Sequence, residues 1–61
     1  MKESIENKIL KLITLEKTNK EIAKELNISK KYVEFLIKKL ISQFGVKSRV
    51  GLCREYMKEI C

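Results

Sequence analysis

The chain has 61 residues, which is enough for one small domain and too few for a second hydrophobic core. It contains no Pro, no Trp and only two Gly, a composition that favours an all-α bundle over a turn-rich β structure. With no His, no glycine-rich phosphate loop and no nucleophile next to a base, it is not expected to be an enzyme or to hold a metal ion, a cofactor or a small-molecule ligand.

Two further exclusions concern location and redox state. No apolar run approaches the roughly 18 residues that cross a bilayer, and Met1-Lys2-Glu3-Ser4 lacks the apolar stretch of a signal peptide. We therefore expect a cytoplasmic protein without a membrane partner. On one continuous helix, Cys53 and Cys61 would lie about 12 Å apart along the axis, too far for an internal disulfide, so free thiols are expected.

The formal net charge of +6 is concentrated in one part of the chain. Residues 1–16 and 50–61 are each neutral and residues 17–28 carry +1, whereas residues 29–49 carry +5, from six cations against Glu34 alone. Such a segment is typical of a solvated face, of a helix on an anionic membrane, or of a nucleic-acid contact. The positions of these charges on the predicted helices distinguish among the three interpretations.

Four helices are predicted, at about residues 4–17, 19–26, 30–44 and 49–60, in one helix-turn-helix domain over residues 1–61. The first is a scaffold helix with one apolar stripe, made by Ile5, Ile9, Leu12 and Ile13.

A capping box, Thr18-Asn19-Lys20-Glu21, predicts the start of the second helix. This helix presents Ile22, Ala23 and Leu26 inward, and the short connection Asn27-Ile28-Ser29 then requires a sharp turn. Asn27 tolerates the left-handed backbone conformation that such a turn needs.

Ser29 is a good N-cap for the third helix, and Gly45 is expected to end it. Its apolar side consists of Val33, Leu36, Ile37, Leu40, Ile41 and Phe44. The opposite side carries Lys31, Phe35, Lys38, Lys39 and Ser42, with Tyr32 and Glu34 at its margins. The helix dipole disfavours cations in the first turn, so Lys30 and Lys31 indicate a phosphate bound there. Membrane binding would explain the geometry of the preceding turn poorly.

Ser48 can cap the fourth helix, whose apolar face is Val50, Cys53, Tyr56, Met57 and Ile60, with Leu52 beside it. That face is wide for a terminal helix. Part of it covers the core, and the surplus predicts a two-fold contact between identical chains through Leu52, Cys53, Tyr56, Met57 and Ile60. Core packing alone is the alternative. For Arg49 we favour a structural role, such as a pair with Glu6, over a phosphate contact.

The segments Asn19-Lys20-Glu21-Ile22-Ala23, Leu26-Asn27-Ile28-Ser29 and Phe44-Gly45-Val46-Lys47-Ser48-Arg49, together with Val33, resemble the LuxR/GerE-type helix-turn-helix. The resemblance covers nearly the whole chain, at the length of a stand-alone GerE-like domain. It implies the four-helix fold of that family's C-terminal effector domain and a bacterial transcriptional regulator. The recognition helix, Lys30 to Phe44, would enter the major groove, and the last helix would form the dimer contact.

The resemblance also implies roles for single positions. Those matching phosphate contacts are Lys31, Tyr32 and Lys39, and those matching base contacts are Glu34, Phe35 and Lys38; further backbone contacts match Thr18, Asn19 and Lys47. With Lys30, these ten residues form the expected DNA-binding site. The chain departs from the family pattern at Glu16, where Gly often sits, at Tyr32, where Thr is usual, at Glu34, where a basic residue is frequent, and at Leu36, where His is common.

The sequence thus predicts a homodimeric transcription factor that binds sequence-specific sites in double-stranded DNA. Glu34 could accept a hydrogen bond from a cytosine N4 amino group, and Phe35 could contact a thymine methyl. The alternative from another class is a protein-interaction module of the same fold, which uses Phe35 and Tyr32 against RNA polymerase or another regulator without binding DNA.

Overall fold

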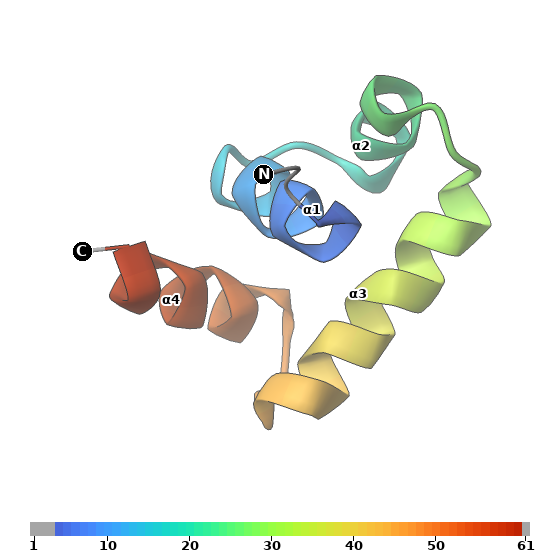
Figure 1. The fold of residues 1–61 in the computed structure, drawn as a ribbon. Coiled ribbons are helices and arrows are strands. Elements are labelled where there is room, and N and C mark those ends of the chain that lie inside the picture. Colours follow the sequence, from blue (N-terminus) through green and yellow to red (C-terminus); the bar gives the residue numbers. More distant parts are fainter. Residues whose placement is uncertain (1–3, 61) are drawn as a thin grey trace.

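In the computed structural model, which describes the backbone of residues 4–60 and the side chains of residues 4–58, four helices and no strand are present. They are α1 (Ile5–Thr14), α2 (Asn19–Leu26), α3 (Lys30–Phe44) and α4 (Arg49–Ile60). The longest, α3, runs along one side of the molecule, and the other three lie on its inner side (Figure 1). The all-α fold expected from the composition is confirmed. None of the helices described is both long and apolar enough to cross a membrane.

Local hydrogen bonds explain where the first three helices begin. Ser4, Thr18 and Ser29 each accept, through the side-chain hydroxyl, a hydrogen bond from the backbone N–H three residues later, at 3.0–3.1 Å. Each bond satisfies one of the amide groups that a helix start leaves without a partner. The caps predicted at Thr18 and Ser29 are confirmed. Helix α4 begins at Arg49, directly after Ser48, whose carbonyl accepts from the Leu52 N–H.

The same three helices end on residues in the left-handed conformation: Glu16 (φ 61°), Asn27 (φ 57°) and Gly45 (φ 68°). In each case the next residue donates its N–H to a carbonyl five positions back, which is the Schellman arrangement. The turns predicted at Asn27 and Gly45 are confirmed. The first helix was expected to reach about Lys17, and this is wrong: α1 ends at Thr14, because the positive φ of Glu16 reverses the chain.

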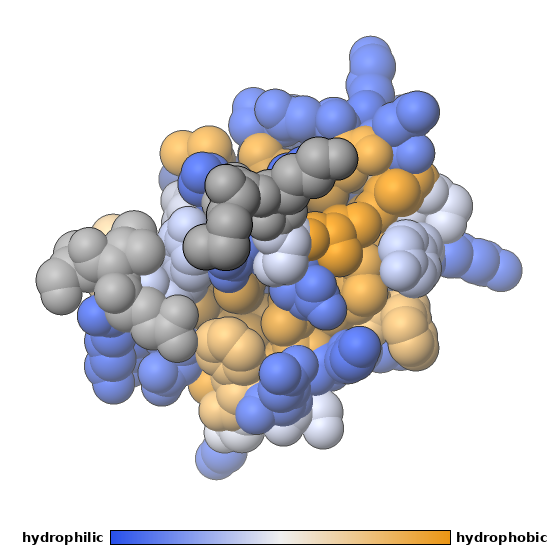
Figure 2. Space-filling model, viewed as in Figure 1, coloured by the Kyte–Doolittle hydropathy of each residue, from blue (hydrophilic) through white to orange (hydrophobic). Residues whose placement is uncertain are grey.

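The core fills the space that the four helices enclose. It consists of Ile9, Leu10, Leu12, Ile13, Ile22, Ala23, Val33, Leu36, Ile37, Leu40, Leu52 and Tyr56. The apolar stripes predicted for the first three helices supply most of these residues. In the space-filling view, hydrophobic side chains gather at the middle of the visible face and hydrophilic ones surround it (Figure 2).

Helix α4 faces the core with a different row of residues than expected. Leu52 is fully buried and Tyr56 is only 8% exposed, because α4 packs against both α1 and α3. Neither residue is available to a second chain, so their assignment to a dimer surface is corrected. The exposed apolar residues of the helix are Val50 and Met57, with exposed fractions of 69% and 45%, and Cys53 is half-buried between them in sequence.

A close approach fixes the start of α4 against the turn that precedes it. A Cβ atom at Gly51 would lie 2.7 Å from the Cβ of Val46, nearer than side-chain carbons can come. Val46 itself packs against the core. Glycine at position 51 therefore allows the first turn of α4 to lie on the α3–α4 connection.

Replacement of Glu16 by Gly should stabilise the fold by about 0.5–1 kcal/mol, since glycine adopts the left-handed conformation without the steric cost that a side chain adds. Urea unfolding at neutral pH measures the change. The matched control is Glu16→Ala, which removes the carboxylate and keeps the Cβ atom, and which should shift the free energy of unfolding by less than about 0.5 kcal/mol. A glycine variant no more stable than the alanine variant would contradict a strained turn at this position.

Candidate nucleic-acid interface

The outer face of α3 is solvent-exposed along its length. Lys31, Lys38, Lys39 and Tyr32 project within about 60° of Phe35 around the helix axis, on the side opposite Val33. Phe35 is 59% exposed and Tyr32 is 44% exposed. Glu34 and Ser42 are exposed as well. The prediction that this face points outward, with a phenylalanine at its centre, is confirmed.

Tyr32 and Phe35 form a stacked pair on this face. Their ring centroids are 6.3 Å apart and their planes differ by 12°. The two residues are three positions apart, so they lie on adjacent turns of α3, where side chains meet. The result is a small aromatic surface that stays open to solvent between rows of lysines.

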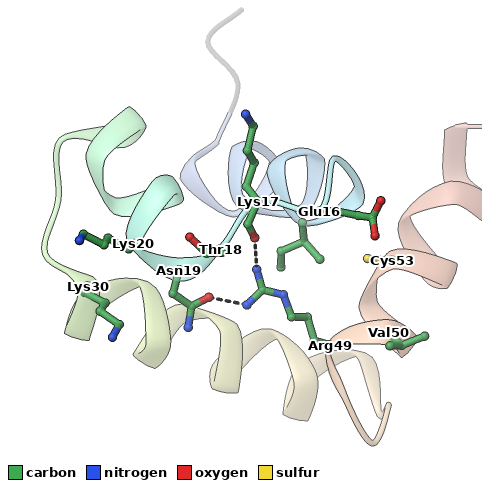
Figure 3. Close-up of a pocket in the computed structure, with 10 residues that line it drawn as sticks. Glu16, Lys17, Thr18, Asn19, Lys20, Lys30, Arg49, Val50 and Cys53 are labelled. Atoms are coloured by element: carbon green, nitrogen blue, oxygen red, sulfur yellow. Dashed lines mark hydrogen bonds between the residues drawn. The ribbon is translucent and has the colours of Figure 1, made fainter.

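A second feature is an open groove of about 660 Å³ at one end of the molecule (Figure 3). The first residues of three helices line it: Asn19 and Lys20 of α2, Lys30 of α3, and Arg49 and Val50 of α4. Lys17 and Thr18 lie on the same rim. Helix starts carry partial positive charge, and the four cations around this groove outnumber its one carboxylate, Glu16, so the groove suits an anion.

The capping box fixes the α2 edge of this groove. The Thr18 N–H donates to Oε1 of Glu21 at 2.8 Å, and the Glu21 N–H donates to the Thr18 hydroxyl at 3.1 Å. The hydrogen bond from the Thr18 backbone is the main cause that holds the pKa of Glu21 below its ordinary value. The hydrogen bond with the Thr18 side chain and the positive charge of Lys17 lower this pKa further. The capping box therefore stabilises the fold fully at neutral pH, where Glu21 is ionised. This stabilisation is lost as the pH falls through the lowered pKa of Glu21.

Arg49 bridges the start of α4 to the start of α2. Its guanidinium donates through Nη1 to Oδ1 of Asn19 and through Nη2 to the Lys17 carbonyl, the latter at 2.6 Å (Figure 3). The structural role favoured from the sequence is confirmed, but the partners are this amide and carbonyl rather than the carboxylate of Glu6. One side chain thus joins α4 to the connection between α1 and α2.

The structure brings some of the predicted site residues together and separates others. Thr18, Asn19 and Lys30 share the groove, whereas Lys47 lies beyond the other end of α3, in a smaller hollow with Arg54 and Lys58. Lys17 and Lys20 also line the groove and were not among the predicted contacts. Lys20 could have been found, because it follows Asn19 directly in the capping motif. Among the side chains described, no three metal-ligating residues come close enough to hold a metal ion.

Comparison with known families agrees with this arrangement. The model for bacterial regulatory proteins of the luxR family, GerE, matches residues 5–56, from the first residue of α1 to the buried Tyr56 of α4. The chain belongs to the LuxR family. No curated protein and no solved structure gives a significant match.

As a LuxR-family domain, the protein is a helix-turn-helix DNA-binding regulator, and the family is not typically enzymatic. Helix α2, the Asn27 turn and α3 form the helix-turn-helix, and α1 and α4 pack behind it. The outer face of α3 therefore belongs to the motif, and the groove lies between the motif and the start of α4.

Loss of the Arg49 bridge should destabilise this LuxR-family fold. Arg49→Ala should lower the free energy of unfolding by about 1.5–3 kcal/mol, since two charge-assisted hydrogen bonds disappear, and Arg49→Lys should recover part of the loss. Thermal and urea unfolding measure both. Arg54→Ala, an exposed arginine on the same helix, is the matched control and should change stability by less than about 0.5 kcal/mol. Equal losses at positions 49 and 54 would contradict the bridge.

Proposed function

We propose that this domain is a sequence-specific transcriptional regulator that binds duplex DNA as a homodimer, with α3 in the major groove. The observation that carries the proposal is the outer face of α3, where Phe35 is open to solvent between Lys31 and Lys38 on one side and Lys39 on the other. An α-helix fits the major groove, and lysines at its edges reach the phosphates on either side. A regulator of this kind acts where chromosomal DNA is, in the cytoplasm.

Two sets of residues are proposed to contact phosphate. On α3 they are Lys31, Tyr32 and Lys39. At the groove, Thr18, Asn19 and Lys30 would receive a phosphate, and Lys47 would contact the backbone beyond the other end of α3. Because Asn19 already accepts from Arg49 through Oδ1, its amide nitrogen is the group that would donate to the phosphate.

Lys38, Phe35 and Glu34 are proposed to contact bases. Lys38 can donate to the acceptors of a guanine edge, and Glu34 can accept from the N4 amino group of a cytosine. Glu34 is exposed at the margin of the face and adds nothing to phosphate attraction. Its proposed contribution is to the choice of sequence.

Salt dependence tests the proposed DNA contacts. The logarithm of the association constant should fall steeply and linearly with the logarithm of salt concentration, and Lys39→Ala should reduce that slope by about 0.9 per protomer and weaken all duplexes alike. Lys38→Ala should instead weaken the preferred duplex about tenfold or more and unrelated duplexes less. Fluorescence anisotropy with a selected duplex and a scrambled one measures both effects.

The matched control for these variants is Lys8→Ala, which removes an exposed lysine from α1, outside the proposed surface. It should leave both the affinity and the slope unchanged within error. Binding that does not respond to salt, or that falls equally in the Lys8 and Lys39 variants, would sink the proposal.

The proposed dimer contact is narrower than the sequence alone suggested. Val50, Cys53 and Met57 are spaced three and four positions apart, so they form one stripe on α4 beside the buried row of Leu52 and Tyr56. A two-fold contact would bury this stripe against its copy. Ile60, which was also assigned to the contact, has its side chain outside the described residues.

A charge on the stripe separates dimerisation from folding. Met57→Glu should give folded monomers that bind DNA weakly, because residue 57 is solvent-exposed in the single chain. Tyr56→Glu should unfold the domain, since it would bury a charge in the core. Sedimentation velocity and circular dichroism distinguish these results. A Met57→Glu variant that sediments as the wild type does would exclude this surface.

A second candidate function is a protein-interaction module that binds RNA polymerase or another regulator without DNA. The exposed aromatic pair favours it, since solvent-exposed aromatic residues often dominate protein interfaces. A capture experiment separates the two functions. The interaction module predicts a protein complex that survives nuclease treatment and for which duplex DNA does not compete, and the DNA-binding regulator does not.

A further inference from the structure

We infer that the stacked Tyr32–Phe35 pair reads thymine: Phe35 contacts the 5-methyl group of a thymine in the major groove, and Tyr32 holds the Phe35 ring in place. This inference rests on the proposed DNA-binding function and gives it a chemical specificity. It concerns two positions of this chain, one of which departs from the family pattern.

The chemistry of Phe35 limits what it can recognise. Its ring carries no hydrogen-bond donor or acceptor. It therefore cannot discriminate among the polar groups that the base edges present in the major groove. The thymine methyl is the apolar group that this groove presents. A phenylalanine at the centre of a major-groove face therefore contributes to sequence preference by apolar contact with that methyl.

The charges around Phe35 favour duplex DNA as the occupant. Lys31 and Lys38 flank the ring on one side and Lys39 on the other, all three are exposed, and the one carboxylate, Glu34, lies farther round the helix at the margin of the face. A duplex offers an apolar methyl on the groove floor with phosphates on both walls, which matches this pattern of one ring between cations. A protein partner would need an apolar pocket with an acidic rim on both sides.

Tyr32 acts as a positioning residue for Phe35. The near-parallel rings, with centroids 6.3 Å apart, restrict the rotamers of Phe35 before any DNA is bound. Less conformational entropy is then lost when the ring meets a base. The tyrosine hydroxyl remains at the edge of the pair, where it can donate to a phosphate, so one side chain can serve both contacts.

Removal of a single methyl group from the DNA tests the contact between Phe35 and thymine directly. Duplexes selected by the wild-type domain from a random pool would be resynthesised with each thymine replaced, one at a time, by uracil, which removes the methyl and leaves the pairing edge intact. At one or more positions in each half-site the affinity should fall about fourfold, the value of one buried methyl group. The Phe35→Ala domain should bind the thymine and uracil duplexes equally.

Further variants separate positioning from direct contact. Tyr32→Phe keeps the stacked ring and should keep the fourfold thymine preference, whereas Tyr32→Ala should reduce it to less than about twofold. Lys39→Ala should weaken the thymine and uracil duplexes by the same factor, so that their ratio is unchanged. Because residues 32 and 35 are exposed, their replacement should leave the circular dichroism spectrum as it is.

The outcomes distinguish the inference from the proposed function. If duplexes are selected, and Lys39→Ala weakens them, but uracil substitution has no effect at any position, thymine reading is wrong while DNA binding stands. A thymine preference that persists in Phe35→Ala overturns the inference in the same way. If no duplex is selected and Phe35→Ala instead abolishes a nuclease-resistant protein complex, both fail.

Discussion

The buried half of α3 is the constraint on which the rest of the molecule depends. The other three helices pack against it, on the row formed by Val33, Leu36, Ile37 and Leu40. Rotation of α3 by a single residue, about 100°, would carry a lysine into the core, where an unpaired charge is strongly unfavourable. The packing of hydrophobic side chains therefore fixes the direction in which Phe35 and its lysines point, and the position of the exposed face is as well determined as the core itself.

Most features that depend on residues close in sequence could be predicted, and they include most of the candidate interface. A capping box needs only the residues from Thr18 to Glu21, and the Asn27 turn depends on the tolerance of one residue type for a positive φ. The exposed side of α3 follows from helical periodicity over 15 residues. These signals place the helix-turn-helix and show which of its side chains reach solvent, because tertiary contacts only confirm what the local pattern already favours.

Features that depend on distant contacts could not be predicted. Arg49 finds its partners 30 and 32 positions away, and nothing in the local sequence selects the Asn19 side chain and the Lys17 carbonyl over a carboxylate. On α4, neighbouring rows of apolar residues compete for the core, and contacts with α1 and α3 decide for Leu52 and Tyr56. The early end of α1 is different, because the bonds that set it are local and only the residue type at position 16 hid it. Glu16 is a helix former, and the Schellman bonds around it hold it in the left-handed region.

In the proposed complex, affinity and selectivity come from different atoms of the same helix. The lysines of α3 attract any duplex, and this attraction carries no sequence information. Phe35 and Glu34 add nothing to phosphate binding, and Glu34 opposes it by charge repulsion. A carboxylate at that position is compatible with tight binding only where a base donor, such as the cytosine N4 amino group, meets it. It therefore lowers affinity for the wrong sequences more than it raises affinity for the right one, which is how an unfavourable contact produces specificity.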